Sequence, residues 1–118
     1  MLSLPPSVRI YLCTKPIDCR RSFDGLCALV VEQLQLDPLS GHLFVFRNRS
    51  GQRLKILYWD RDGLAVWYKR LEQGTFKLPT SASSGSQGAE ITPAALAMLL
   101  EGIDIDTCKR HQRYCRPT

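Results

Sequence analysis

The alternation of apolar and polar positions is clearest in the middle of the chain. Three runs there, at residues 43–47, 54–59 and 64–69, are rich in leucine, β-branched and aromatic residues, a composition typical of β-strands. Turn-forming residues at 48–51 and 60–63 separate these runs. The pattern therefore predicts two linked hairpins.

Pairing across the second hairpin divides its side chains between two faces. The four-residue connection places Trp59 opposite Leu64 on one face, together with Lys55 opposite Tyr68, while Trp67 lies on the other face. Both faces are largely apolar, and such a sheet needs cover on each side. We expect the C-terminal helix to cover one of them. The alternative is an aromatic patch around Trp59 or Trp67 that stays open for a protein partner.

Two helices are predicted, one before and one after the hairpins. Ser22 is placed to cap the first, the long helix of the expected fold, and Asp37-Pro38 ends it. Thr92 caps the second, with Pro93 at its first position and Gly102 at its end. The apolar positions are Phe23, Leu26, Cys27, Val30 and Leu34 in the first helix and Leu96, Leu99 and Leu100 in the second.

The remaining segments complete a single domain over residues 1–106. Residues 8–12 alternate and predict a first strand, and 75–78 are compatible with a short one. The Ser- and Gly-rich stretch 80–89 is expected to be a flexible loop, and the basic tail 107–118 to be disordered. The predicted fold class is α+β: a small, mostly antiparallel sheet of four to five strands, with a long helix on one face and a short C-terminal helix.

Size and composition indicate a globular protein. The 118 residues, 44% of them hydrophobic, suffice for one core but not for two domains. No apolar run approaches the roughly 20 residues that cross a bilayer, and residues 1–6 lack the features of a signal peptide. We expect a cytoplasmic protein without membrane contact.

The five cysteines do not follow the pattern of a disulfide framework, because their number is odd and their spacing irregular. Cys108, His111 and Cys115 would offer three ligands to zinc, whereas a structural zinc site normally takes four. Whether these three residues bind a metal stays open from the sequence, and no cofactor is predicted.

Positive charge is concentrated before the first helix, around the first hairpin turn and in the C-terminal tail, within a net charge of +5. A two-stranded ribbon fits a DNA major groove, where guanidinium groups reach phosphates and guanine edges. Protection of a sheet edge, or a solvated surface, explains the same residues. The candidate DNA contacts are Arg20, Arg21, Arg47, Arg49, Arg53, Lys55, Lys109, Arg110, Arg113 and Arg116.

Carboxylates raise the question of a metal-dependent nuclease, and Asp18, Asp24, Asp60 and Asp62 are the residues to consider. Asp60 and Asp62 bracket a predicted turn, and Asp24 falls in a first helical turn, both favoured places for carboxylates on local grounds. The histidines have no Ser or Cys partner in a recognisable motif, and no glycine-rich phosphate loop is present. We therefore expect a protein that is not an enzyme.

Long ordered blocks carry a resemblance to a known family. They include DCRRSFDGL at residues 18–26, SGHLFVF and LKILYWD within 40–60, and ITPAALAMLLEGID at 91–104. In these blocks, over roughly residues 5–106, the chain resembles the TnpB accessory protein, the second reading frame, of the insertion-sequence-sixty-six class of bacterial insertion sequences. The resemblance implies an accessory protein of transposition that acts with the element's transposase and another small accessory protein. It also implies that the acidic catalytic triad resides in the separate transposase.

Two mechanisms are compatible with that role. In the first, the protein acts stoichiometrically, its basic hairpin and tail contacting transposon DNA while an apolar surface meets a protein partner. In the second, it is an adaptor with protein contacts alone, and its positive charge serves solubility. The first requires the scattered cationic side chains to converge on one surface of the folded chain.

Overall fold

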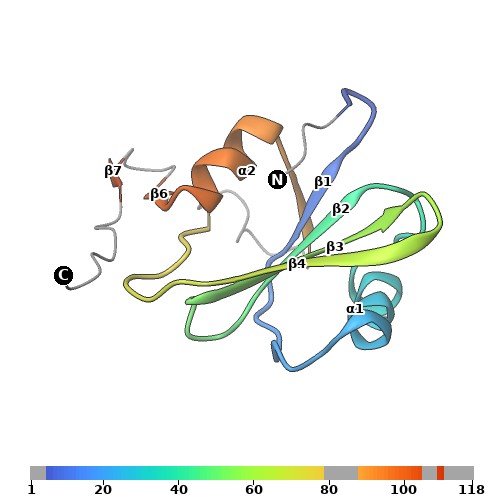
Figure 1. The fold of residues 1–118 in the computed structure, drawn as a ribbon, viewed down its shortest axis with the longest axis horizontal. Helices are drawn as coiled ribbons and strands as arrows, with labels where there is room; N and C mark the ends of the chain where they lie inside the picture. Colours follow the sequence, from blue (N-terminus) through green and yellow to red (C-terminus); the bar gives the residue numbers. More distant parts are fainter. Residues whose placement is uncertain (1–4, 79–87, 105–108, 111–118) are drawn as a thin grey trace.

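The computed structural model describes residues 5–78, 88–104 and 109–110. Its main sheet has one helix on each side, so that the elements form three layers (Figure 1). In chain order the elements are β1 (Ile10–Cys13), α1 (Phe23–Leu29), η1 (Val30–Leu34), β2 (Leu43–Arg47), β3 (Arg53–Asp60), β4 (Gly63–Arg70), β5 (Gly88–Ile91), α2 (Pro93–Leu100), β6 (Ile103–Asp104) and β7 (Lys109–Arg110).

The five-stranded sheet has the order β4-β3-β2-β1-β5 and is mixed. β1 and β2 run parallel, with Ile10 beside Leu43, and the other neighbours are antiparallel. The expectation of a mostly antiparallel sheet was therefore wrong. Parallel neighbours need a long crossover, and the segment between β1 and β2, which contains α1, supplies it. β6 and β7 form a separate two-stranded pair.

The two predicted hairpins are confirmed as β2-β3 and β3-β4. In the second, Trp59 pairs with Leu64 and Lys55 with Tyr68, in the register expected from the sequence. The strands extend to Asp60 and Gly63, so the actual loop is only two residues long. The hydrophobic alternation and the turn chemistry together fixed this register.

The first helix is shorter and less regular than predicted. α1 has 7 residues and continues into the 5-residue π-helical segment η1, so the expectation of a long helix was wrong. Ser22 occupies the N-cap position, but its side chain makes no capping hydrogen bond. The helix ends at Gln35, which adopts a left-handed φ of +56° and donates its N–H to the Val30 carbonyl.

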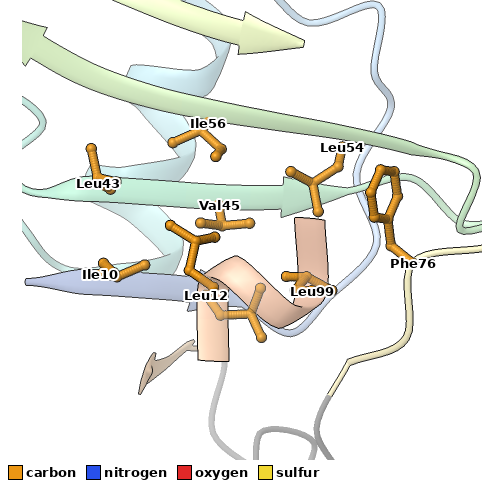
Figure 2. Packing of buried hydrophobic residues seen from close by; sticks show 9 residues of the cluster. Ile10, Leu12, Leu43, Val45, Leu54, Ile56, Phe76 and Leu99 are labelled. Carbon is orange, nitrogen blue, oxygen red and sulfur yellow. The ribbon is translucent and has the colours of Figure 1, made fainter. Parts of the chain in front are cut away.

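Hydrophobic clusters fill the spaces on both sides of the sheet. The cluster beneath α2 contains Ile10, Leu12, Leu43, Val45, Leu54, Ile56, Phe76, Leu96 and Leu99 (Figure 2). The cluster beneath α1 contains Cys13, Leu26, Leu29, Val30, Phe44, Phe46 and Leu57. The expected cover of the second sheet face by the C-terminal helix is thus confirmed. Neighbouring residues of β2 and β3 alternate between the two clusters.

The signals that bound α2 act as the sequence indicated. Thr92 Oγ1 accepts a hydrogen bond from the Ala95 N–H at 3.0 Å, and Pro93 occupies the first helical turn. Gly102 follows the helix with a φ of +76°, a conformation that glycine adopts without the steric cost of a Cβ. No helix in the described parts of the chain is long and apolar enough to span a membrane.

Other segments also differ from the predictions. β1 begins at Ile10 rather than at residue 8, and 75–78 form no strand, although Phe76 is fully buried. β5 begins at Gly88, within the range predicted as a loop; residues 79–87 lie outside the described part. Of the predicted tail, only Lys109–Arg110 is described, as β7 paired with β6.

Candidate nucleic-acid interface

Three of the predicted DNA-contacting arginines come together around one pocket of about 550 Å³. The segment that leads into α1, the β2-β3 turn and the adjoining ends of β3 and β4 form its walls. Its lining residues are Ile17, Asp18, Cys19, Arg20, Asn48, Arg49, Ser50, Arg53 and Tyr68. We call this the arginine pocket.

Hydrogen bonds of Asn48 hold the β2-β3 turn that forms one wall. Its side-chain oxygen accepts from the Arg53 N–H at 3.0 Å, and its side-chain nitrogen donates to Ser50 Oγ at 3.0 Å. Gly51, with a φ of +80°, closes the turn by donating its N–H to the Asn48 carbonyl. A bridge between Ile17 and Asn48 ties this turn to the chain entering α1. The wall is therefore built from fixed backbone.

Arg49 and Arg53 differ in how far the protein constrains them. Arg49 is exposed, and no described residue forms a hydrogen bond or an ion pair with it. Arg53 is half-buried and donates from Nη1 to the Tyr68 hydroxyl at 2.5 Å. That hydrogen bond raises the pKa of Arg53 above its usual value. Both guanidinium groups are charged at neutral pH.

Arg20 brings a third guanidinium group, which is paired with a carboxylate. It donates from Nη2 to Asp18 Oδ2 at 2.8 Å and from Nε to both carboxylate oxygens at 3.1 Å. These side-chain hydrogen bonds lower the pKa of Asp18 to about 2. Among the described lining residues Asp18 carries the only carboxylate, against three arginines, so the pocket has a net positive charge.

Lys55 lies behind the pocket rather than on its surface. The lysine is only 7% exposed, and Nζ donates to the Arg21 carbonyl at 2.7 Å. The ammonium also lies 4.6 Å from the centroid of the Tyr68 ring, a cation–π distance. Lys55 therefore orients Tyr68 and adds buried positive charge. The Arg21 side chain is exposed and lines a neighbouring pocket of about 220 Å³ with Lys15.

Arg47 points away from the arginine pocket, although it belongs to the same hairpin. Its guanidinium Nη1 donates to the Phe76 carbonyl at 2.8 Å, on the α2 side of the sheet. Burial lowers the pKa of Arg47 from its usual value. Its contacts tie the segment after β4 to the sheet. The side chains of Lys109 and Arg110 are not described, and Arg113 and Arg116 lie outside the described residues.

Sequence reasoning assigned no role to several residues of the pocket, of which Tyr68 and Cys19 are the most informative. Tyr68 is 45% exposed. Its predicted pairing with Lys55 already indicated that it lies close to the basic turn. Cys19 is buried, and burial raises the pKa of its thiol, so the thiol is protonated at neutral pH. Asn48 and Ser50 gave only a turn signal.

Comparisons with known proteins identify the family of this chain. A family model described as "IS66 Orf2 like protein" matches residues 8–110. The chain belongs to this family. Two relatives from Sinorhizobium fredii carry the titles "Uncharacterized protein y4hO" and "Uncharacterized protein y4jC" and are 42% and 36% identical over 118 residues. Each comparison covers 100% of this chain and 97% of the relative. No solved structure matches the chain.

The carboxylates of this IS66 Orf2-like chain are dispersed. Asp18 is paired with Arg20, Asp24 is in the first turn of α1, and Asp60 is at the opposite end of the β3-β4 hairpin from Arg53. Within the described ranges, no group of three or more His, Cys, Asp or Glu side chains is arranged to hold a metal ion. Cys108, His111 and Cys115 fall outside those ranges.

The two tryptophans of the proposed partner surface lie on opposite faces of the sheet. Trp67 is half-buried and packs against the cluster beneath α2. Trp59 is also half-buried and, by strand alternation, shares the α1 face with Leu57. One continuous patch therefore does not contain both rings. A role for either in binding the transposase stays a prediction for this IS66 Orf2-like protein.

Proposed function

We propose that this IS66 Orf2-like protein is a non-catalytic accessory factor of transposition that grips transposon DNA through the arginine pocket. In this role it acts with the element's transposase and the other small accessory protein. Family membership supports the connection to an insertion sequence. The arginine pocket supports DNA as a ligand, because guanidinium groups bind phosphates through charge and directed hydrogen bonds.

The convergence of Arg20, Arg49 and Arg53 is the observation that carries the proposal. Arg20 and Arg49 are far apart in the sequence, yet both border one pocket with a single carboxylate among its described lining residues. Edge protection alone does not require arginines from a helix approach and from a hairpin turn to meet. Binding of one anionic ligand by all three arginines does require them to lie close together.

Salt dependence of DNA binding tests this function. If three arginines each neutralise a phosphate, the logarithm of affinity for duplex DNA falls with the logarithm of salt concentration at a slope of about −2.7. Arg49→Ala is expected to bring the slope to about −1.8. Fluorescence anisotropy of a labelled oligonucleotide over a salt series measures both slopes.

A matched control comes from the far end of the same hairpin. Arg61 is exposed and lies in the loop between β3 and β4, whereas Arg53 and Arg70 pair at the other end. Arg61→Gln removes the same formal charge as Arg49→Ala, and its slope is expected to match that of the unmodified protein. Absence of saturable DNA binding at low salt, or equal effects of the two substitutions, would overturn the proposal.

A protein-only adaptor is the second candidate function, and the outer side of the first helix favours it. Phe23 is 44% exposed and Val31 is 54% exposed, and the half-buried Cys27 lies between them at helical spacing. Such a stripe suits contact with an apolar partner surface. This candidate predicts binding to purified transposase that Phe23→Ser weakens and that Arg49→Ala leaves unchanged.

The non-catalytic character of the proposed factor is supported by the placement of its carboxylates. Phosphodiester cleavage by two metal ions needs carboxylates within a few ångström of both ions, whereas Asp18 is paired with Arg20 and Asp60 borders a distant turn. We expect no divalent-dependent nicking of supercoiled plasmid. Nicking that Asp60→Asn abolishes would contradict this part of the proposal.

A further inference from the structure

We propose that the arginine pocket takes one unpaired nucleotide of single-stranded DNA, with a phosphate against Arg49 and Arg53 and the base against the ring of Tyr68. This inference rests on the proposed function and deepens it, because it names the form of DNA that the pocket recognises. Unpaired DNA exposes base faces that a duplex keeps stacked.

The concave shape of the site favours an unpaired strand. The three guanidinium groups border an open hollow of about 550 Å³. A single nucleotide enters such a space, whereas a duplex is much wider and presents its phosphates on a convex outer surface. The exposed arginines at the border of the pocket are within reach of either form of DNA, but only an unpaired nucleotide also places its base beside the pocket lining.

Tyr68 supplies the aromatic surface that a base requires. It lines the pocket and is 45% exposed, although it is anchored at two points. Its hydroxyl accepts from Arg53, and the buried Lys55 ammonium lies 4.6 Å from its ring centroid. These contacts fix the orientation of the ring before any ligand binds, so stacking a base on its exposed part costs little additional side-chain entropy.

Positive charge beside an exposed aromatic ring is the combination found in sites for single strands, where cations follow the backbone and rings stack on bases. The side chains of Asn48 and Ser50, which also line the pocket, hydrogen-bond to each other at 3.0 Å. They shape the turn and leave the arginines and Tyr68 as the main ligand-binding groups. We therefore expect little dependence on base sequence.

The first test needs no altered protein. A labelled oligothymidine is compared by fluorescence anisotropy with a strand of equal length and charge in which stable abasic units replace every nucleotide. Both strands offer the same phosphates, and only the first offers bases. Because stacking of one base contributes about 1–3 kcal/mol, the abasic strand is expected to bind roughly 5- to 150-fold more weakly.

The second test assigns that difference to Tyr68. Tyr68→Leu is expected to weaken oligothymidine binding by the same factor and to leave abasic binding unchanged, so that the two strands become equivalent. Tyr68→Phe keeps the ring and removes only the hydroxyl that accepts from Arg53. It is expected to retain most of the preference for bases. Circular dichroism checks that each variant is folded.

Duplex DNA of the same sequence separates failure of this inference from failure of the proposed function. Binding of duplex as tightly as oligothymidine, with no loss on the abasic strand, would overturn the nucleotide pocket and leave DNA binding in place. Absence of binding to any of the three DNA forms at low salt would overturn both. Weaker binding of the duplex and of the abasic strand, each by more than about fivefold, would support the inference.

Discussion

At the scale of single residues, the pair formed by Asp18 and Arg20 controls how much positive charge the arginine pocket offers. The pKa of Asp18 is lowered from 3.8 to about 2, chiefly by side-chain hydrogen bonds from Arg20. Because the folded-state pKa is the lower one, the contribution of the pair to stability is complete above about pH 4 and is lost as the pH falls through about 2. NMR titration of the carboxyl carbon checks this value. Arg20→Ala is expected to raise the pKa toward 3.8.

Removal of the Asp18 charge is expected to strengthen DNA binding. Asp18→Asn keeps the side-chain oxygen that accepts from the Arg20 N–H and frees the Arg20 guanidinium for a phosphate. An exposed ion pair is weak because solvent screens it, so we expect only a small rise in affinity. Anisotropy at constant salt measures the change. Unchanged or weaker binding would show that Arg20 does not contact DNA.

Arg47 and Arg49 are two positions apart, yet the structure gives them different roles. Arg47→Ala removes the donor to the Phe76 carbonyl and is expected to lower the free energy of unfolding by about 1–3 kcal/mol. Arg49→Ala removes no hydrogen bond or ion pair with a described residue and should change stability by less than about 0.5 kcal/mol. Urea denaturation measures both. For DNA affinity we expect the reverse order, so that Arg49→Ala lowers the affinity more than Arg47→Ala does.

At the scale of elements, the β3-β4 loop contains a non-glycine residue in a backbone conformation that favours glycine. Arg61 has a φ of +58°, a left-handed conformation that costs a non-glycine residue about 1–2 kcal/mol. Arg61→Gly is expected to raise the free energy of unfolding by about 0.5–1 kcal/mol, because relief of this cost exceeds the added entropy of the unfolded chain. Asp62 has no positive φ, so Asp62→Gly serves as the control and should destabilise. Thermal denaturation ranks the two.

Elements defined by local chemistry were predictable, and those defined by distant pairing were not. The alternation of apolar residues and the turn sequence at 60–63 predicted the β3-β4 register correctly. Thr92, Pro93 and Gly102 likewise predicted the two ends of α2. β5 contains Gly88, Ala89 and Glu90, residue types depleted in strands. Only pairing with the open edge of β1 makes it a strand. The parallel pairing of β1 with β2 depends likewise on the path of the crossover.

In the candidate site, too, local pairing was predictable and the contribution of distant segments was not. Lys55 opposite Tyr68 was predicted, and the same pairing puts Arg53 at the adjacent position of that face. Alternation along β2 also places Arg47 with Val45 on the α2 face, which sequence reasoning did not use. Entry of Arg20 into the pocket depends on residues 14–20, whose sequence has no period that fixes a path. The convergence of charge therefore required the tertiary structure.

At the scale of the whole molecule, the sheet belongs to both cores. On β2, Leu43 and Val45 face α2, while Phe44 and Phe46 face α1, and all four are buried. Movement of this strand to suit one layer disturbs the packing of the other. The three layers are therefore expected to unfold in one cooperative transition, as is usual for a domain of this size.

The two tryptophans allow each layer to be followed separately. Trp67→Phe leaves Trp59 as a probe on the α1 face, and Trp59→Phe leaves Trp67, which packs on the cluster beneath α2. Adding Leu99→Ala beneath α2 is expected to reduce the free energy of unfolding by about 3–5 kcal/mol in both backgrounds. Urea titrations followed by fluorescence measure this loss at each probe. If α2 unfolded as a separate unit, the transition reported by Trp67 would shift and the transition reported by Trp59 would not. Equal shifts at both probes require a single cooperative structure. In that case a cavity beneath α2 destabilises the packing beneath α1 as well, because both layers pack against the same sheet.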